Sequence, residues 1–168
     1  MNNWPAIIES LQEGSDVTVD PLRWNLDNPE YNKILSLWKK ANFNLDSIRW
    51  TNYYPGIHFL QDIIDQQLEY LSIKQVHRAW ISKIDPGYMA PWHWDVDDNE
   101  EEFLKNGSIV RYTVIIKQMA HGHILIIGND HYYNKPKDTV IKWGNYKEWH
   151  SSVNAGMEPS YLLHILGC

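Results

Sequence analysis

From residue 74 onward, short apolar segments alternate with turn-forming residues, and this pattern constrains the fold more than any other feature of the chain. Asp85-Pro86-Gly87, Asn106-Gly107 and Gly144-Asn145 are typical of tight reversals. The runs between such turns are rich in β-branched and aromatic residues, which favour strands. They lie at 76–84, 89–96, 108–118, 122–129, 139–143, 148–154 and 160–166. Many short strands at this spacing indicate an antiparallel sandwich or barrel.

The first 73 residues show a different, helical pattern. Asn28-Pro29-Glu30 combines an N-cap residue, a proline at the first helical position and an acid in the first turn. The segment that follows it, and a second one at 57–73, place apolar side chains at helical spacing. We therefore expect one domain, 1–168, that is mainly β with flanking helices: a helical part at 1–73 packs on a β core at 74–168.

Composition narrows the possible function. The net charge of −6, from 15 basic and 21 acidic residues, argues against a nonspecific nucleic-acid binder, which needs a basic surface. Cys168 is the single cysteine, so no disulfide can form within the chain, which favours a reducing cytoplasm. We expect no signal peptide and no membrane partner, because no segment approaches the ~20 apolar residues that span a bilayer.

The segment "PWHWDV" contains the most informative pair of residues, His93 and Asp95. Strand side chains alternate between faces, so this imidazole and this carboxylate project together and can chelate a metal. His150 is the best candidate for a third ligand, with His121 and His123 as competitors. Two histidines and one carboxylate leave coordination positions open and suit non-heme Fe(II). A histidine bonded to a nearby acid is the structural alternative, and the acids at 97–102 are most simply a solvated loop.

"ISKIDPGYMAPWHWD" followed by "WHSSVNAGMEPSYLLHILG" resembles the Fe(II)/2-oxoglutarate-dependent dioxygenases, in particular the aspartyl/asparaginyl β-hydroxylase-like branch and related small phage oxygenases. The resemblance covers roughly residues 75–168. It implies a double-stranded β-helix (a cupin-like jelly roll), Fe(II) on His93, Asp95 and His150, and 2-oxoglutarate and O2 as cosubstrates. The expected activity is hydroxylation of a C–H bond in a small-molecule or peptide substrate.

The sequence departs from that family where the distal carboxylate of 2-oxoglutarate should meet a buried cation. The position about ten residues after His150 is Ser160, which carries no charge. Arg111 matches a second arginine of the β-hydroxylase-like branch, Thr113 shares its strand face, and His164 shares a face with Ser160. These four residues are the candidate cosubstrate site.

Several alternatives stay open. Arg111 is explained about as well by a structural ion pair as by a cosubstrate anchor. Because Ser160 carries no charge, an iron oxygenase that does not use 2-oxoglutarate is a second alternative. A cupin-like metal-binding or purely structural jelly roll is a third. The aromatic segment 49–59 is a further candidate, as part of a substrate mouth.

Overall fold

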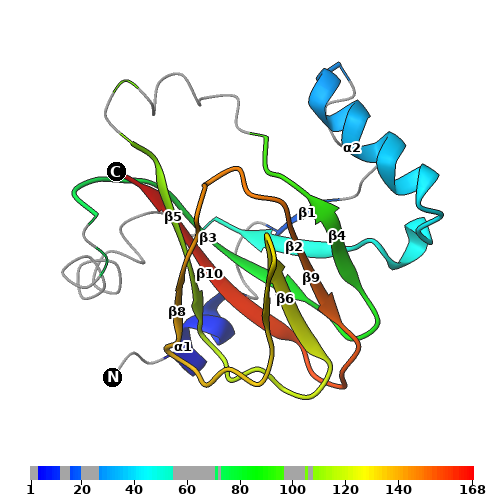
Figure 1. The fold of residues 1–168 in the computed structure, drawn as a ribbon. Helices are drawn as coiled ribbons and strands as arrows, with labels where there is room; N and C mark the ends of the chain where they lie inside the picture. Colours follow the sequence, from blue (N-terminus) through cyan, green and yellow to red (C-terminus); the bar gives the residue numbers. More distant parts are fainter. Residues whose placement is uncertain are drawn as a thin grey trace.

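Two antiparallel β-sheets lie face to face and enclose the centre of the molecule, with helices outside them (Figure 1). This computed structural model describes residues 4–11, 16–19, 27–54, 71, 73–96, 105 and 108–168. The strands are β1 (Asp16–Val19), β2 (Trp50–Tyr53), β3 (Val76–Ile84), β4 (Met89–His93), β5 (Val110–Ile115), β6 (His123–Ile127), β7 (Asp130–Tyr132), β8 (Val140–Lys142), β9 (His150–Asn154) and β10 (Ser160–Gly167). The helices are α1 (Trp4–Ser10), α2 (Pro29–Lys40) and the 3-10 turn η3 (Leu45–Ser47).

The strand order identifies the architecture. The large sheet runs β1-β2-β3-β10-β5-β8 and the small sheet β4-β9-β6-β7. Strands that are distant in sequence, such as β3 and β10, pair along their whole length. This is a double-stranded β-helix, which confirms the predicted mainly-β jelly roll with flanking helices.

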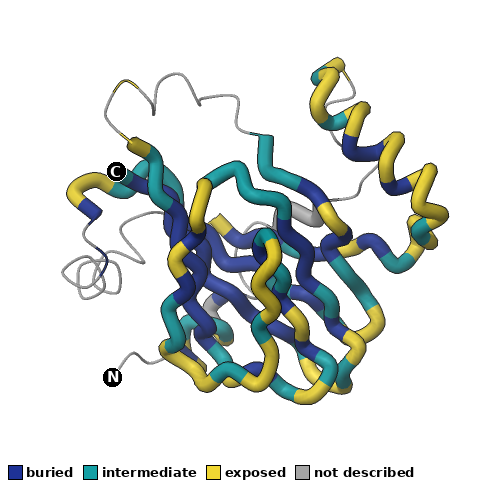
Figure 2. The backbone as a smooth tube through the Cα atoms, viewed as in Figure 1, coloured by how far each residue is buried: buried dark blue, intermediate teal, exposed yellow. Residues whose placement is uncertain are grey.

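The large sheet is covered on both faces, and each face has its own chemistry. One face carries an aliphatic and aromatic cluster that includes Ile81, Val114 and Leu163 and is closed by Trp4 of α1, which is 1% exposed. The opposite face carries the alternate residues, such as Trp80 and His164, and looks toward the small sheet. Figure 2 shows that the buried residues are concentrated in these central strands. The polar face of the large sheet therefore lies inside the molecule, where it can form a site.

Helix α2 forms as predicted and packs beside the first strand of the small sheet. The Asn28 side chain accepts a hydrogen bond from the N–H of Glu30, which satisfies one of the donors left open at a helix start. Its buried side chains, Ile34, Leu35 and Trp38, join a cluster with Trp50 and Ala90. The Trp38 indole also donates to the Trp92 carbonyl at 2.8 Å, so α2 holds the end of β4.

The structure also corrects some expected elements. The part at 1–73 is not only helical: β1 and β2 lie in it and extend the large sheet through β3. Residues 130–132, which lie outside the predicted strand runs, form β7 and pair with β6. The second helix, expected at 57–73, and the acidic loop at 97–102 lie almost entirely outside the described residues. No helix within the described ranges is long and apolar enough to cross a bilayer.

Candidate metal centre

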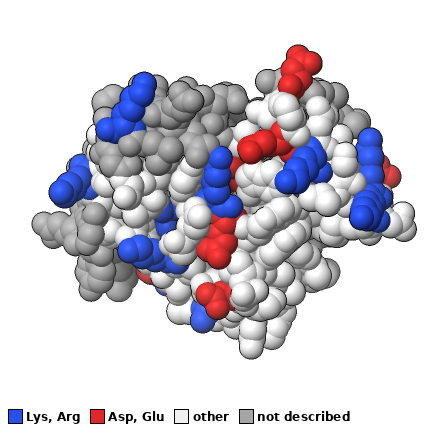
Figure 3. All heavy atoms as spheres, turned by 45° about the horizontal axis from the view of Figure 1, so that its top comes forward, with Lys and Arg blue, Asp and Glu red and all other residues white. Residues whose placement is uncertain are grey.

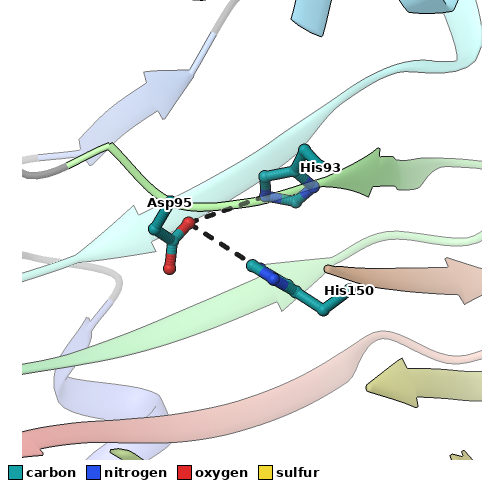
Figure 4. Close-up of side chains that lie close together, drawn as sticks. All are labelled: His93, Asp95 and His150. Carbon is teal, nitrogen blue, oxygen red and sulfur yellow. Dashed lines mark ion pairs between the residues drawn. The ribbon is translucent and has the colours of Figure 1, made fainter. Parts of the chain in front are cut away.

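His93, Asp95 and His150 come together at the end of the strand pair β4–β9 (Figure 4). His93 and His150 are direct cross-strand partners, and their ring centroids lie 4.2 Å apart. Asp95 lies just beyond β4, and its Oδ1 is 3.6 Å from Nε2 of His93 and 3.7 Å from Nε2 of His150. One potential ligand atom from each residue lies within 4.8 Å of the others. This triad can hold a metal ion, as the sequence predicted.

Backbone carbonyls orient both imidazoles for metal binding. Nδ1 of His93 lies 2.6 Å from the Pro91 carbonyl, and Nδ1 of His150 lies 3.0 Å from the Glu148 carbonyl. A carbonyl can only accept, so each Nδ1 carries the proton and each Nε2 presents a lone pair. Metal-binding histidines in proteins are typically held in this way.

Aromatic side chains fix the planes of the two rings. Trp50 stacks on His93 with centroids 5.7 Å apart, and Trp38 meets His93 edge-on. Trp143 meets His150 edge-on at 4.6 Å. Both histidines are 6% exposed, and burial, as the largest cause, lowers the pKa of each imidazole below its ordinary value. The neutral form that a metal requires is therefore favoured.

Arg111 forms an ion pair with the second oxygen of Asp95. Its Nη1 contacts Oδ2, while Oδ1 faces the histidines. Burial opposes ionisation of Asp95, but the Arg111 charge, followed by His150 and His93, outweighs it and holds the pKa of the carboxyl below its ordinary value. The guanidinium also lies 3.7 Å from the Trp143 ring centroid and 5.0 Å from that of Trp80. Asp95 is thus ionised and oriented before any metal binds.

Two of the four candidate cosubstrate residues line the cavity beside the triad, and two do not. Arg111 and His164 lie on its wall. Thr113 is fully buried behind it, where its hydroxyl contacts Nδ1 of His164 at 3.1 Å. Ser160 shares the strand face of His164, but it is four residues away, about 13 Å along an extended strand. It lies opposite Ile84 and outside the described lining of the cavity.

The cavity consists of two adjacent chambers, whose shared lining is made by Trp50, Asn52, Trp80, His93, Asp95 and Arg111. The inner chamber continues into the barrel past Ser82, Ser152 and His164 and has a volume of about 50 Å³. The outer chamber opens past Tyr54 and Arg78 and has a volume of about 180 Å³. The triad lies between a smaller space and a larger one whose lining includes several aromatic side chains.

The sequence reasoning missed most of the residues that β2 and β3 contribute to these walls. Asn52 lies in the part expected to be helical, and Trp80 and Ser82 lie on a strand that was not linked to the site. Trp50, Asn52 and Tyr54 do fall within the aromatic segment 49–59 that was expected at a substrate mouth. The alternation of Trp50, Asn52 and Tyr54 was the available signal, because it is the period of a strand.

The competing histidines have other roles. His123 is buried, and its ring nitrogens bond the Ala120 N–H and the Glu158 carbonyl. His121 is exposed in the preceding turn. Across the described ranges, the triad is the one cluster of His, Cys, Asp and Glu with metal-binding geometry.

Several solved structures are similar to this chain, at low sequence identity and with TM-scores below 0.5. The sequence matches no protein-family model and no curated protein. Among solved structures, the chain is similar to a predicted oxalate decarboxylase from Thermotoga maritima, with TM-score 0.43, 11% identity and coverage of 71% of this chain and 80% of that one. It is similar to a cupin 2 conserved barrel protein from Rhodopseudomonas palustris, with TM-score 0.41, 9% identity and coverage of 72% and 62%. It is also similar to a cupin-superfamily sugar phosphate isomerase from Silicibacter pomeroyi, with TM-score 0.40, 10% identity and coverage of 71% and 59%. Two of these three structures are named as cupin proteins.

Proposed function

We propose that the protein is a non-heme iron oxygenase that uses 2-oxoglutarate to hydroxylate a C–H bond of a small substrate. The observation that carries this proposal is the triad of His93, Asp95 and His150, with both Nε2 atoms turned toward one carboxylate oxygen. Two imidazoles and one carboxylate on one side of a metal leave the opposite positions open, which suits Fe(II) and O2.

The donor set fits such a metal before it binds. The Nδ1 protons are held by backbone carbonyls, the rings are fixed by tryptophans, and Arg111 holds Asp95 ionised. Bound Fe(II) would supply O2 activation. The chain itself would supply the orientation of the ligands, the binding of an organic acid and a cavity with limited access to water.

The inner chamber offers hydrogen-bond donors for the distal carboxylate of 2-oxoglutarate. Nδ1 of His164 acts as an acceptor, because Arg111, whose Nη2 lies 3.5 Å from it, can only donate. The Thr113 hydroxyl, which accepts from Trp143 at 2.9 Å, therefore donates to this Nδ1, and Nε2 of His164 carries the proton. Ser82 donates to Oδ1 of Asn52, so the bond uses the acceptor of this side chain and not its amino group. Nε of Arg111 is buried and has no partner among the described residues. Such an orphaned donor is the kind that a bound acid satisfies.

The size of the inner chamber agrees with this role. A cavity needs about 10–15 Å³ to hold one water molecule, so about 50 Å³ corresponds to roughly three to five small groups. That space suits the carboxylate tail of a dicarboxylic acid whose other end lies at the metal. The proposed anchor is therefore His164, Asn52 and Arg111, and not Ser160.

The ion pair of Arg111 favours a second candidate function. A guanidinium already bonded to Asp95 and stacked on tryptophan has fewer donors left for a cosubstrate. In that case the domain is a cupin-like metal-binding protein whose chemistry does not use 2-oxoglutarate.

Metal and cosubstrate titrations separate these functions. We expect Fe(II), or Mn(II) as an air-stable substitute, to bind one site per chain by calorimetry. His93→Ala and His150→Ala should each weaken binding at least about 100-fold, because even residues behind the ligands affect affinity 10–100-fold. His121→Ala, at an exposed histidine, is the matched control and should bind normally. Metal binding that survives both triad variants would refute the proposed site.

The cosubstrate is tested on the metal-loaded protein. We expect 2-oxoglutarate to bind and to be converted to succinate slowly without substrate. Asn52→Ala should raise the Kd of 2-oxoglutarate about tenfold, and Ser160→Ala should leave it unchanged. A protein that binds metal but neither binds nor consumes 2-oxoglutarate would support the second candidate.

A further inference from the structure

The metal triad depends on both sheets of the molecule. His93 and His150 belong to the small sheet, where they form the end of β4 and the beginning of β9. Asp95 follows β4, but its carboxylate is held by Arg111 of β5, in the large sheet. The relative position of the two sheets at this end therefore affects whether the three ligands meet. A side chain that contacts both sheets here can fix that position.

Trp143 is such a side chain. It follows β8 directly, and its backbone N–H donates to the Arg111 carbonyl at 2.9 Å, which continues the pairing of β8 with β5. The segment 144–149 then leads from the large sheet to His150 in the small one. The indole is 3% exposed and belongs to a buried cluster that includes Leu162 of the large sheet and Leu125 of the small sheet. Trp143 therefore lies at the junction of the two sheets.

Three contacts fix three parts of the indole. The guanidinium carbon of Arg111 lies over the face of the ring, 3.7 Å from its centroid. The imidazole of His150 meets the ring in a T-shaped arrangement, with centroids 4.6 Å apart and an interplanar angle of 69°. The indole N–H donates to the hydroxyl of the buried Thr113 at 2.9 Å. This hydrogen bond fixes the rotation of the ring, and in that rotation the ring contacts Arg111 and His150 together.

The contact with the ring face matters because Arg111 is a buried cation. Figure 3 shows lysine and arginine side chains on the surface that it draws, interspersed with acidic ones, where water solvates them. Arg111 is 3% exposed, and its surroundings are the carboxylate of Asp95, the ring of Trp143 and, at 5.0 Å, the ring of Trp80. The attraction between a cation and an aromatic face is strongest when both are desolvated. The indole therefore holds the guanidinium in place, and through it the Asp95 carboxylate.

We propose that Trp143 is a positioning residue of the metal centre, which places two of the three ligands at once: His150 by direct contact, and Asp95 through Arg111. Trp143 supplies no ligand atom itself. The inference rests on the proposed function, because it concerns the same triad. No sequence motif marks Trp143 for this role, since the residues that it positions are held by β5 and β9 and meet it only in the folded protein.

Calorimetric titration of the full chain with Mn(II) tests this role. Trp143→Leu removes the ring and should weaken Mn(II) binding about 10–100-fold, which is the effect typical of residues that orient metal ligands. Trp143→Phe should stay within about threefold of the native protein, because it keeps an aromatic ring beside Arg111 and His150. Circular dichroism checks that each variant is folded. Trp143→Met carries the same expectation as Trp143→Leu and replaces it if that variant does not fold.

Trp4 provides the matched controls. Its indole is 1% exposed and donates its N–H to Asp138, but it lies on the opposite face of the large sheet, away from the triad. Trp4→Leu and Trp4→Phe therefore remove a comparable buried ring or hydrogen bond without touching the site. Both controls should lose stability and bind Mn(II) like the native protein.

Two further measurements separate positioning from a general loss of stability. The visible absorption of bound Co(II) reports the geometry of its ligands, so its bands should shift in Trp143→Leu and not in Trp4→Leu. In the metal-free protein, the ring current of Trp143 should displace the NMR signals of the His150 ring protons. Trp143→Leu should therefore move these signals more than Trp143→Phe does.

A double-mutant cycle tests the route through Arg111. Arg111→Met removes the guanidinium and keeps a long side chain in its place. If the indole acts on Asp95 through Arg111, Trp143→Leu should change Mn(II) affinity by a smaller factor in the Arg111→Met background than in the native one, because coupled residues are not additive. Equal factors in the two backgrounds would overturn this route.

Native Mn(II) affinity in Trp143→Leu, or an equal loss of affinity in Trp4→Leu, would overturn the inference. Its failure is distinguishable from failure of the proposed function. A Trp143→Leu variant that binds metal and 2-oxoglutarate as the native protein does would refute the inference alone. A native protein without metal affinity would refute the proposed function, while the His150 signals of the metal-free protein would still show whether Trp143 places that ring.

Discussion

His164 should make the stability of the metal-free protein fall steeply in mild acid. The imidazole is 5% exposed, stacks on Trp80 and accepts a hydrogen bond from Thr113 at Nδ1. Burial first, and then the charge of Arg111 at 3.5 Å, lower its pKa to about 3, although Asp95 acts in the opposite direction. The folded state therefore keeps His164 neutral at pH values where the unfolded chain is protonated.

The sign and size of the effect follow from proton linkage. An unfolded histidine has a pKa near 6.5, so the stability contributed by neutral His164 is complete above that pH and is lost as the pH falls from 6.5 toward 3. At pH 4.5 the unfolded pKa lies two units above the pH, and each unit corresponds to ~1.36 kcal/mol. The expected loss is about 3 kcal/mol, a large share of a typical stability of ~5–15 kcal/mol.

Urea denaturation in the presence of a chelator, between pH 7.5 and 4.5, measures this loss. His93 and His150 have lowered pKa values as well and act in the same direction, so the test is the difference between native protein and a variant. His164→Gln keeps a hydrogen-bond acceptor, and His164→Phe keeps the ring on Trp80. Both should show a pH dependence shallower by about 3 kcal/mol, whatever their stability at pH 7.5. Curves that run parallel to the native one would refute the buried, neutral state of His164.

Two further predictions concern the support of the site and of the fold. Trp143→Phe keeps an aromatic ring beside Arg111 but removes the hydrogen-bond donor to Thr113. We expect the free energy of unfolding to fall by about 1 kcal/mol. A change near zero would mean that the hydrogen bonds from Trp143 to Thr113 and His164 do not stabilise the protein. Gly122→Ala should cost clearly more than Gly87→Ala by thermal denaturation. Both glycines have positive φ, at about 1–2 kcal/mol of strain, but only at Gly122 would a methyl group meet the backbone of Gly156. An equal loss of stability in the two variants would contradict the close packing of the Gly122 loop against the Gly156 loop.

The sequence alone predicted the strand-rich half of the molecule and the three side chains that the structure brings together, with His121 and His123 as competitors for the place of His150. Each of β3, β4, β5, β6, β8 and β9 lies within a run that the sequence predicted as a strand, and β10 extends one residue beyond its predicted run. This succeeded because strand propensity and turn chemistry are local properties. The pairing of His93 with Asp95 was also readable, since two residues of separation place them close together in extended chain.

Other features could be decided only by the tertiary structure. β2 was not anticipated, because its alternation extends over only a few residues, and its strand form is stabilised by pairing with β3. The role of Arg111 was open between an ion pair and a cosubstrate anchor, and the structure shows the ion pair with Asp95. Ser160, expected near the cosubstrate from its distance in sequence, shares a strand face with His164 yet lies outside both chambers, since position along the strand decides which residues reach a cavity.

The register between strands is the physical reason for this division. His150 was a candidate ligand from its place in the chain, but it meets His93 only because β4 and β9 pair with these two residues opposite each other. A shift of one residue in the register of β9 against β4 would turn His150 to the other face of the sheet and separate it from His93 and Asp95. The sequence supplies the chelating side chains and their alternation, while the strand register, set by packing and loops over the whole domain, brings them to a single point.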